Sequence, residues 1–185
     1  FYFYKNDGLQ NQWVLYTHDN LDAKPKVLLD PNTFSDDGTV ALRGTYFSND
    51  SRYLGYGVSS SGSDWKEFYI LDLSTNQLLD DHIQWIKFSG MAWTETGFFY
   101  STFPKPKEGE ELSGTNENSK VYYHELGTDQ TTDILIYEDT EHPRHSPYVY
   151  TTENNQFLIL YQSKGTHGNT ISIKDLNNPN SPFIS

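Results

Sequence analysis

The sequence predicts an all-β protein made of consecutive four-stranded sheets, arranged as the blades of a β-propeller. Aromatic residues make up 16% of the 185 residues, with 14 Tyr and 11 Phe against a single Met, and aromatic side chains favour strands. One strand pattern also recurs along the chain with a period of about 50 residues, which is typical of propeller blades. Composition and repetition therefore lead to the same fold class.

The repeated unit begins with an aromatic strand end, a polar turn and a second strand. Its three clearest copies are residues 46–56 (YFSNDSRYLGY), 92–100 (AWTETGFFY) and 150–160 (YTTENNQFLIL). A third strand follows each copy, at 68–76 (FYILDLSTN), 121–128 (VYYHELGT) and 170–177 (TISIKDLN). Leu73, Leu126 and Leu176 hold the same place in these third strands, and their numbering spaces them 53 and 50 residues apart. We therefore expect three successive sheets of one design.

A partial copy of the unit precedes these three. Residues 13–19 (WVLYTHD) match the third strand, and Asp19 lies 54 residues before Leu73. Short apolar runs at 26–29, 84–88 and 133–137 supply a fourth strand. We expect residues 1–185 to form a partial propeller domain, with the end of one blade and about three further blades. An antiparallel sandwich with similar hairpins is the alternative, and the regular spacing favours the propeller.

Two polar loops interrupt the strands. Residues 104–120 contain two prolines and two glycines among charged and polar side chains, a composition typical of loops. We expect them to form a long hairpin loop within one blade. The second loop, residues 59–65 (SSSGSDW), has no large apolar side chain before Trp65.

Charge and composition exclude several classes of partner. The net charge of −12, from 25 acidic and 13 basic residues, repels phosphate backbones, so nucleic acid is not an expected partner. No run approaches the roughly 20 apolar residues of a membrane span, so no membrane partner is expected either. The absence of cysteine is compatible with the cytoplasm and the periplasm alike. Residues 1–5 lack the pattern of a signal peptide, and a start within the repeat indicates a fragment.

Motifs for catalysis or metal binding are missing from the sequence. It contains neither the Gly-x-Ser-x-Gly of a hydrolase nucleophile nor a Gly-rich phosphate loop. Of the six histidines, only His142 and His145 lie close together, and the sequence marks no further ligands for them. We therefore predict no catalytic residue, no metal site and no cofactor in this chain.

Five runs of the sequence closely resemble stretches of the propeller in prolyl oligopeptidases. They are residues 4–12 (YKNDGLQNQ), 36–43 (DDGTVALR), 61–65 (SGSDW), 87–93 (KFSGMAW) and 122–130 (YYHELGTDQ). These matches follow the family's order and spacing across nearly the whole chain. The resemblance implies a seven-bladed propeller that covers the active site of an α/β-hydrolase domain with a Ser-Asp-His triad. Such a serine-type peptidase cleaves short peptides after proline and excludes large folded proteins.

The resemblance also implies the partners of this chain, which are short proline-containing peptides and the hydrolase domain of the same parent protein. Because that domain and its triad lie outside residues 1–185, we expect no activity from the chain alone. Two alternatives remain open. One is a stand-alone propeller that binds a ligand without catalysis. The other is a related oligopeptidase that prefers basic residues, although the runs GSDW and FSGMAW favour the prolyl type.

The resemblance assigns roles to three residues. Phe88 matches a phenylalanine that offers an apolar wall to the bound peptide. Asp64 matches an aspartate that pairs with a substrate-contacting arginine of the hydrolase domain, and Arg43 matches an arginine at the interdomain face. The competing interpretations are a core aromatic for Phe88, an Asx-turn for Asp64 and a solvated strand-end charge for Arg43. Gly90 departs from the family, where other residues, sometimes cysteine, are common, so packing beside Phe88 is expected to differ.

Overall fold

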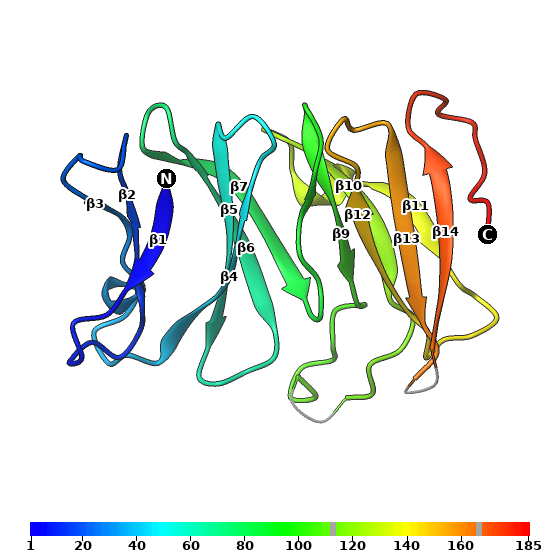
Figure 1. The fold of residues 1–185 in the computed structure, drawn as a ribbon. Coiled ribbons are helices and arrows are strands. Elements are labelled where there is room, and N and C mark those ends of the chain that lie inside the picture. Colours follow the sequence, from blue (N-terminus) through cyan, green and yellow to red (C-terminus); the bar gives the residue numbers. More distant parts are fainter. Residues whose placement is uncertain (112–113, 166–167) are drawn as a thin grey trace.

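The computed structural model describes residues 1–111, 114–165 and 168–185. Across these residues the chain forms strands in four antiparallel sheets, together with two 3-10 turns, η1 (Pro31–Thr33) and η2 (Gln130–Thr132). The sheets stand side by side in chain order, from blue to red in Figure 1. The predicted all-β fold of consecutive propeller blades is confirmed. In the part of the chain that the structure describes, no helix is long and apolar enough to cross a membrane.

Sheets 2 and 3 have the four strands predicted for a complete unit. Sheet 2 contains β4 (Val40–Phe47), β5 (Tyr53–Ser60), β6 (Lys66–Asp72) and β7 (Gln77–Ile86). Sheet 3 contains β8 (Ala92–Trp93), β9 (Gly97–Thr102), β10 (Lys120–Glu125) and β11 (Ile134–Glu138). Each strand pairs with the next along the chain. The loop predicted over residues 104–120 joins β9 to β10, although Lys120 already belongs to β10.

Sheets 1 and 4 have three strands each. Sheet 1 contains β1 (Tyr2–Lys5), β2 (Val14–Thr17) and β3 (Lys26–Leu29). Sheet 4 contains β12 (Ser146–Thr151), β13 (Phe157–Ser163) and β14 (Asn169–Asp175). The C-terminal segment extends sheet 4, because Ile173 and Ile184 exchange two backbone hydrogen bonds of 2.8 and 2.9 Å. The strand predicted within residues 13–19 is β2, and the run at 26–29 is β3.

One predicted strand has the wrong bounds. The fourth strand of sheet 2 was expected at 84–88, whereas β7 begins at Gln77 and ends at Ile86. Two residues at this end are left-handed, Trp85 near the end of β7 with a φ of +62° and Phe88 just beyond the strand with a φ of +55°. This conformation departs from the extended backbone of a strand. Phe88 therefore belongs to the connector between sheets 2 and 3.

Apolar side chains fill the space between neighbouring sheets. The core between sheets 2 and 3 is formed by Phe68, Ile70, Ile83, Ile86, Met91, Trp93, Phe98 and Tyr100. The core between sheets 3 and 4 is formed by Ala92, Phe99, Val121, Leu158 and Leu160. Gly55 lets the sheets approach, since a methyl group there would overlap Sδ of Met91. Sheets 2, 3 and 4 thus bury apolar faces against one another, as propeller blades do.

A buried polar bridge joins sheets 2 and 3. The fully buried ring of His124 lies between two carboxylates, with Nε2 3.0 Å from Oδ1 of Asp81 and Nδ1 2.7 Å from Oδ1 of Asp133. The hydroxyl of Tyr100 donates to the second oxygen of Asp133 at 2.6 Å. Burial alone would lower the pKa of His124, but the hydrogen bonds and charges of both carboxylates outweigh it and raise the pKa to about 9. His124 is therefore an imidazolium at neutral pH.

Candidate functional site

The connectors between sheets gather on one side of the molecule. Strand direction alternates within each sheet, so the loop between the second and third strands turns at the same edge as the connector to the next sheet. Figure 1 shows these segments along the lower edge of the sheets. We term this surface the connector face and define it by residues 61–65, 87–91, 103–111, 114–119 and 139–145. Two of the predicted site residues, Asp64 and Phe88, lie on it.

Phe88 is held on the surface of the connector face. Its side chain is 63% exposed, so the structure does not support a core position. The ring meets Phe103 edge to face, with centroids 6.4 Å apart. The next residue, Ser89, is buried and fixed, because its Oγ accepts from the backbone N–H of Ser101 at 2.8 Å and its carbonyl accepts from Nζ of Lys66 at 2.7 Å. The fixed connector turns Phe88 outward.

Lys87 links Phe88 to Asp64, and sequence reasoning missed it. Lys87 is 8% exposed, and its Nζ lies 4.0 Å from Oδ2 of Asp64 and 5.6 Å from the ring centroid of Phe88. The same Nζ lies 5.0 Å from the ring centroid of Trp65 and donates to Oδ1 of Asn116 at 3.0 Å. The carboxylate of Asp64 is 72% exposed, so it can still pair with a cation from outside the chain.

Arg43 lies on β4, near a partly buried lysine, Lys66. Its Nε donates to Oγ of Ser59 at 2.9 Å, and its side chain is exposed. Burial lowers the pKa of Lys66, and the charge of Arg43 lowers it further. Because Lys66 contacts the carbonyl of Ser89, these cations lie around the connector that carries Phe88. This positive group stands out in a chain of net charge −12.

Gly90, in the same connector, packs against Tyr46 of sheet 2. A Cβ on this residue would lie 2.9 Å from Cε1 of Tyr46, so the tyrosine ring would have to move to admit any side chain. Close packing of Tyr46 beside the connector therefore favours glycine at this position.

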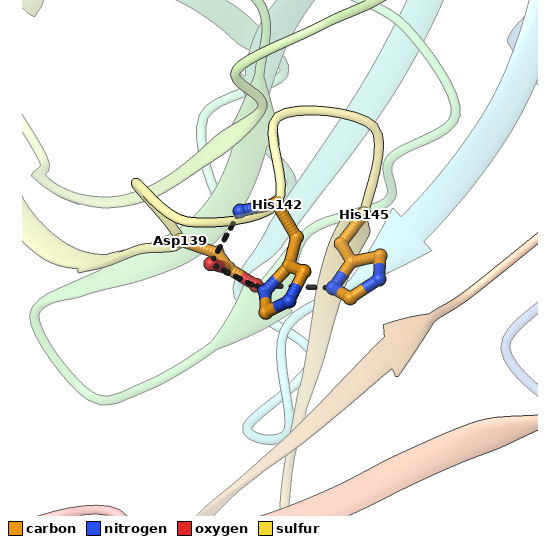
Figure 2. Close-up of side chains that lie close together, drawn as sticks. All are labelled: Asp139, His142 and His145. Carbon is orange, nitrogen blue, oxygen red and sulfur yellow. Dashed lines mark hydrogen bonds and ion pairs between the residues drawn. The ribbon is translucent and has the colours of Figure 1, made fainter.

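A cluster of Asp139, His142 and His145 occupies another connector of the same face, between β11 and β12 (Figure 2). Oδ2 of Asp139 lies 3.2 Å from Nδ1 of His142 and 3.0 Å from Nδ1 of His145. The two imidazole rings stack with centroids 4.4 Å apart. Sequence spacing indicated the two histidines but not the aspartate, which a turn of the loop brings to them.

Four adjacent antiparallel sheets with their connectors on one face define the chain as part of a β-propeller domain. The family described as prolyl oligopeptidase, N-terminal beta-propeller domain, matches residues 1–185. The chain belongs to this family.

Relatives agree with this assignment over nearly the whole chain. It is 45% identical over 178 residues to a prolyl endopeptidase of Elizabethkingia miricola and 34% identical over 203 residues to prolyl oligopeptidase A of Amanita bisporigera. These alignments cover 96% and 95% of this chain but 25% and 26% of the relatives. The chain therefore spans about a quarter of the length of the curated relatives it matches.

Solved structures of the family have the same fold. Prolyl oligopeptidase B from Galerina marginata, bound to a 35mer hydrolysis and macrocyclization substrate, superposes with a TM-score of 0.86 at 30% identity, over 99% of this chain and 29% of that one. A prolyl endopeptidase from a study of inter-domain dynamics superposes with a TM-score of 0.85 at 31% identity, over 98% of this chain and 26% of that one. The likeness thus extends to the arrangement of the sheets.

Proposed function

We propose that residues 1–185 form part of the propeller of a serine-type prolyl oligopeptidase that cleaves short peptides after proline. The observation that carries the proposal is the outward Phe88, which is 63% exposed at a φ of +55°. Non-glycine residues in this conformation cost energy and tend to cluster at functional sites. Membership of the family supplies the reaction, since the relatives above are named for it.

The connector face would turn toward the hydrolase domain of the same protein. There the exposed ring of Phe88 offers an apolar wall to a short proline-containing peptide, and the exposed carboxylate of Asp64 pairs with an arginine of the hydrolase domain. Lys87 orients that carboxylate from 4.0 Å away. Arg43 contributes a further charge to the interdomain surface. By covering the active site, the propeller excludes large substrates and water, which strengthens electrostatic interactions inside.

The role of Phe88 can be tested with the full-length protein and a chromogenic peptide that releases its dye after proline. Phe88→Ala removes an apolar contact of about 1–2 kcal/mol, so kcat/KM should fall about tenfold. Leu78→Ala is the matched control, because Leu78 is 53% exposed on β7, away from the connector face. Equal losses in both variants, or none in either, would reject the role of Phe88.

The role of Asp64 has a separate test. Asp64→Asn keeps the shape of the side chain but removes its charge, so the arginine of the hydrolase domain loses its partner and kcat/KM should fall while thermal unfolding stays unchanged. If Asp64→Asn has the same kcat/KM as the unmodified protein, the interdomain pairing is rejected.

The same assays separate the alternative functions. A full-length protein that binds peptides without cleaving them would be a stand-alone binding propeller. Cleavage after lysine or arginine in place of proline would indicate the related oligopeptidase of different specificity. Cleavage after proline supports the proposal.

A further inference from the structure

We propose that Asp139, His142 and His145 bind a divalent transition-metal ion, with Zn²⁺ as the best match. This site is independent of the proposed peptidase function. Each residue offers one donor atom, a ring nitrogen or a carboxylate oxygen, and these three atoms all lie within 4.8 Å of one another. Figure 2 shows the two rings side by side with the aspartate next to them. The three residues occupy a single loop of seven residues, so bringing them together around an ion costs little chain entropy.

The distances suit a tetrahedral ion. With ligand bonds of about 2.0–2.2 Å, neighbouring donor atoms of a tetrahedral zinc site lie roughly 3.2–3.6 Å apart. The carboxylate oxygen Oδ2 lies 3.2 Å from Nδ1 of His142 and 3.0 Å from Nδ1 of His145. The two rings are stacked at an interplanar angle of 14°, so at least one of them must rotate for both nitrogens to aim at one point. His142 is free to do so because its side chain is 56% exposed.

The carboxylate of Asp139 is the shared acceptor of this cluster. Its Oδ2 lies 3.0 Å from Nδ1 of His145 and accepts from Nε2 of Gln162. A cation at this point would replace the donated protons, because it accepts lone pairs from the carboxylate and from the neutral ring nitrogen. With the amide of Gln162 reversed, its oxygen would become a further ligand and its NH₂ would face the hydroxyl of Thr170, now 3.4 Å from Oε1.

The loop holds its shape through hydrogen bonds of its backbone, which leave Oδ2 of Asp139 to the ion. The backbone N–H groups of Glu141 and His142 donate to Oδ1 of Asp139 at 3.1 and 3.0 Å, which forms the turn. From the β9–β10 loop, the backbone N–H of Asn118 donates to the carbonyl of Pro143 at 2.7 Å. A donor set held by its own backbone loses less entropy on binding a metal.

The chemistry of the donors selects the ion. Two imidazoles and one carboxylate favour Zn²⁺, Cu²⁺ or Ni²⁺ over Ca²⁺ and Mg²⁺, which prefer oxygen ligands. The surrounding pocket is lined by Glu138 and Glu141 as well as Lys164, and Glu138 is paired with Lys120 at 2.7 Å. In a chain of net charge −12, the local field attracts cations.

The ion would cross-link two sheets. Asp139 directly follows β11, and His145 directly precedes β12, so the metal joins the end of sheet 3 to the start of sheet 4. An ion that binds only the folded chain raises its thermal stability in proportion to the logarithm of the metal concentration. The proposed role is structural, and three protein ligands leave the fourth position to water or to Gln162.

The experiment uses full-length protein stripped with a chelator and titrated with ZnCl₂ by calorimetry and with CoCl₂ by visible absorption. The test variants are Asp139→Asn and the double variant His142→Ala/His145→Ala. The matched control is His82→Ala, because His82 is an exposed histidine that contacts one carboxylate, Glu67, at 2.7 Å. Other metal sites in the full-length protein contribute equally to all four proteins and cancel in the comparison.

The proposal predicts that the unmodified protein and His82→Ala bind one more Zn²⁺ than the double variant, and that Asp139→Asn weakens this event at least tenfold. Bound Co²⁺ should show the intense visible bands of a tetrahedral site, and the melting temperature should rise with Zn²⁺ but not with Mg²⁺. Equal stoichiometry and affinity in all four proteins would overturn the proposal. If the double variant unfolds, the single variant His142→Ala decides, since the exposed ring of His142 contributes little to packing.

Discussion

The buried imidazolium of His124 should stabilise the protein at neutral pH and cease to do so above about pH 9. The pKa of His124 rises from its ordinary value of 6.5 to about 9 in the folded chain. Because the folded-state pKa is the higher one, this stabilisation is fully present below pH 6.5 and is lost as the pH rises through 9. At about 1.4 kcal/mol for each tenfold change in proton affinity, the difference corresponds to about 3 kcal/mol.

Urea unfolding between pH 6 and 10, followed by tryptophan fluorescence, would measure this effect. His124→Gln is the informative variant, because a neutral amide removes the cation between the two buried carboxylates. Asp133 then keeps only the hydroxyl of Tyr100 and Asp81 the backbone N–H of Gly127 as fixed donors, and neither keeps a positive charge. Breaking a buried ion pair in this way costs about 3–5 kcal/mol, so the variant should be less stable at pH 6 and lack the decline toward pH 9. Parallel pH profiles for the two proteins would refute the reasoning.

Two further changes probe the contacts between sheets. Gly55→Ala places a methyl group against Sδ of Met91 and 3.1 Å from the ring of Trp93, so the free energy of unfolding should fall by about 1–3 kcal/mol, and an unchanged urea midpoint would show that Met91 moves aside freely. Trp93→Phe removes the 3.0 Å bond from Nε1 to the carbonyl of Tyr46. It should cost about 1–3 kcal/mol, and calorimetric melting that matches the unmodified protein would contradict this.

The repeating part of the fold could be predicted because its signal is local. The third strands β6, β10 and β14 overlap the segments predicted at 68–76, 121–128 and 170–177 and begin one or two residues before them. Each is an alternating aromatic and aliphatic run that ends in a polar turn. The same pattern located the partial unit at residues 13–19, where β2 lies. Period and alternation are properties of neighbouring residues, so a single sequence carries them.

The bounds of β7 were missed for the opposite reason. Its first half, residues 77–83, carries Asp80, Asp81 and His82, and such a charged run does not indicate a strand. In the structure Asp81 is buried because it meets His124, 43 positions further along the chain, on sheet 3. A charge that is neutralised across two sheets leaves no local pattern.

Some residues of the candidate site could also be predicted from local sequence, and others could not. The run KFSGMAW marked Phe88, but the sequence did not mark Lys87, whose partners Asp64 and Asn116 come from two other loops of the connector face. In the 139–145 connector the pair of histidines was visible, whereas Asp139 joins them through a turn made by backbone N–H groups. Residues that act through contacts between loops need the fold before they can be recognised.

Packing and function also occupy different parts of each unit. The sheets bury their strands against one another, so a change such as Gly55→Ala is felt through the core between sheets. The connector at 87–91 combines both, because Lys87, Ser89 and Met91 are buried and Phe88 is exposed. An anchored connector can exchange its exposed side chain without disturbing the sheets. This explains how an apolar side chain on one connector and a metal-binding cluster on the next can coexist on a single repeating scaffold.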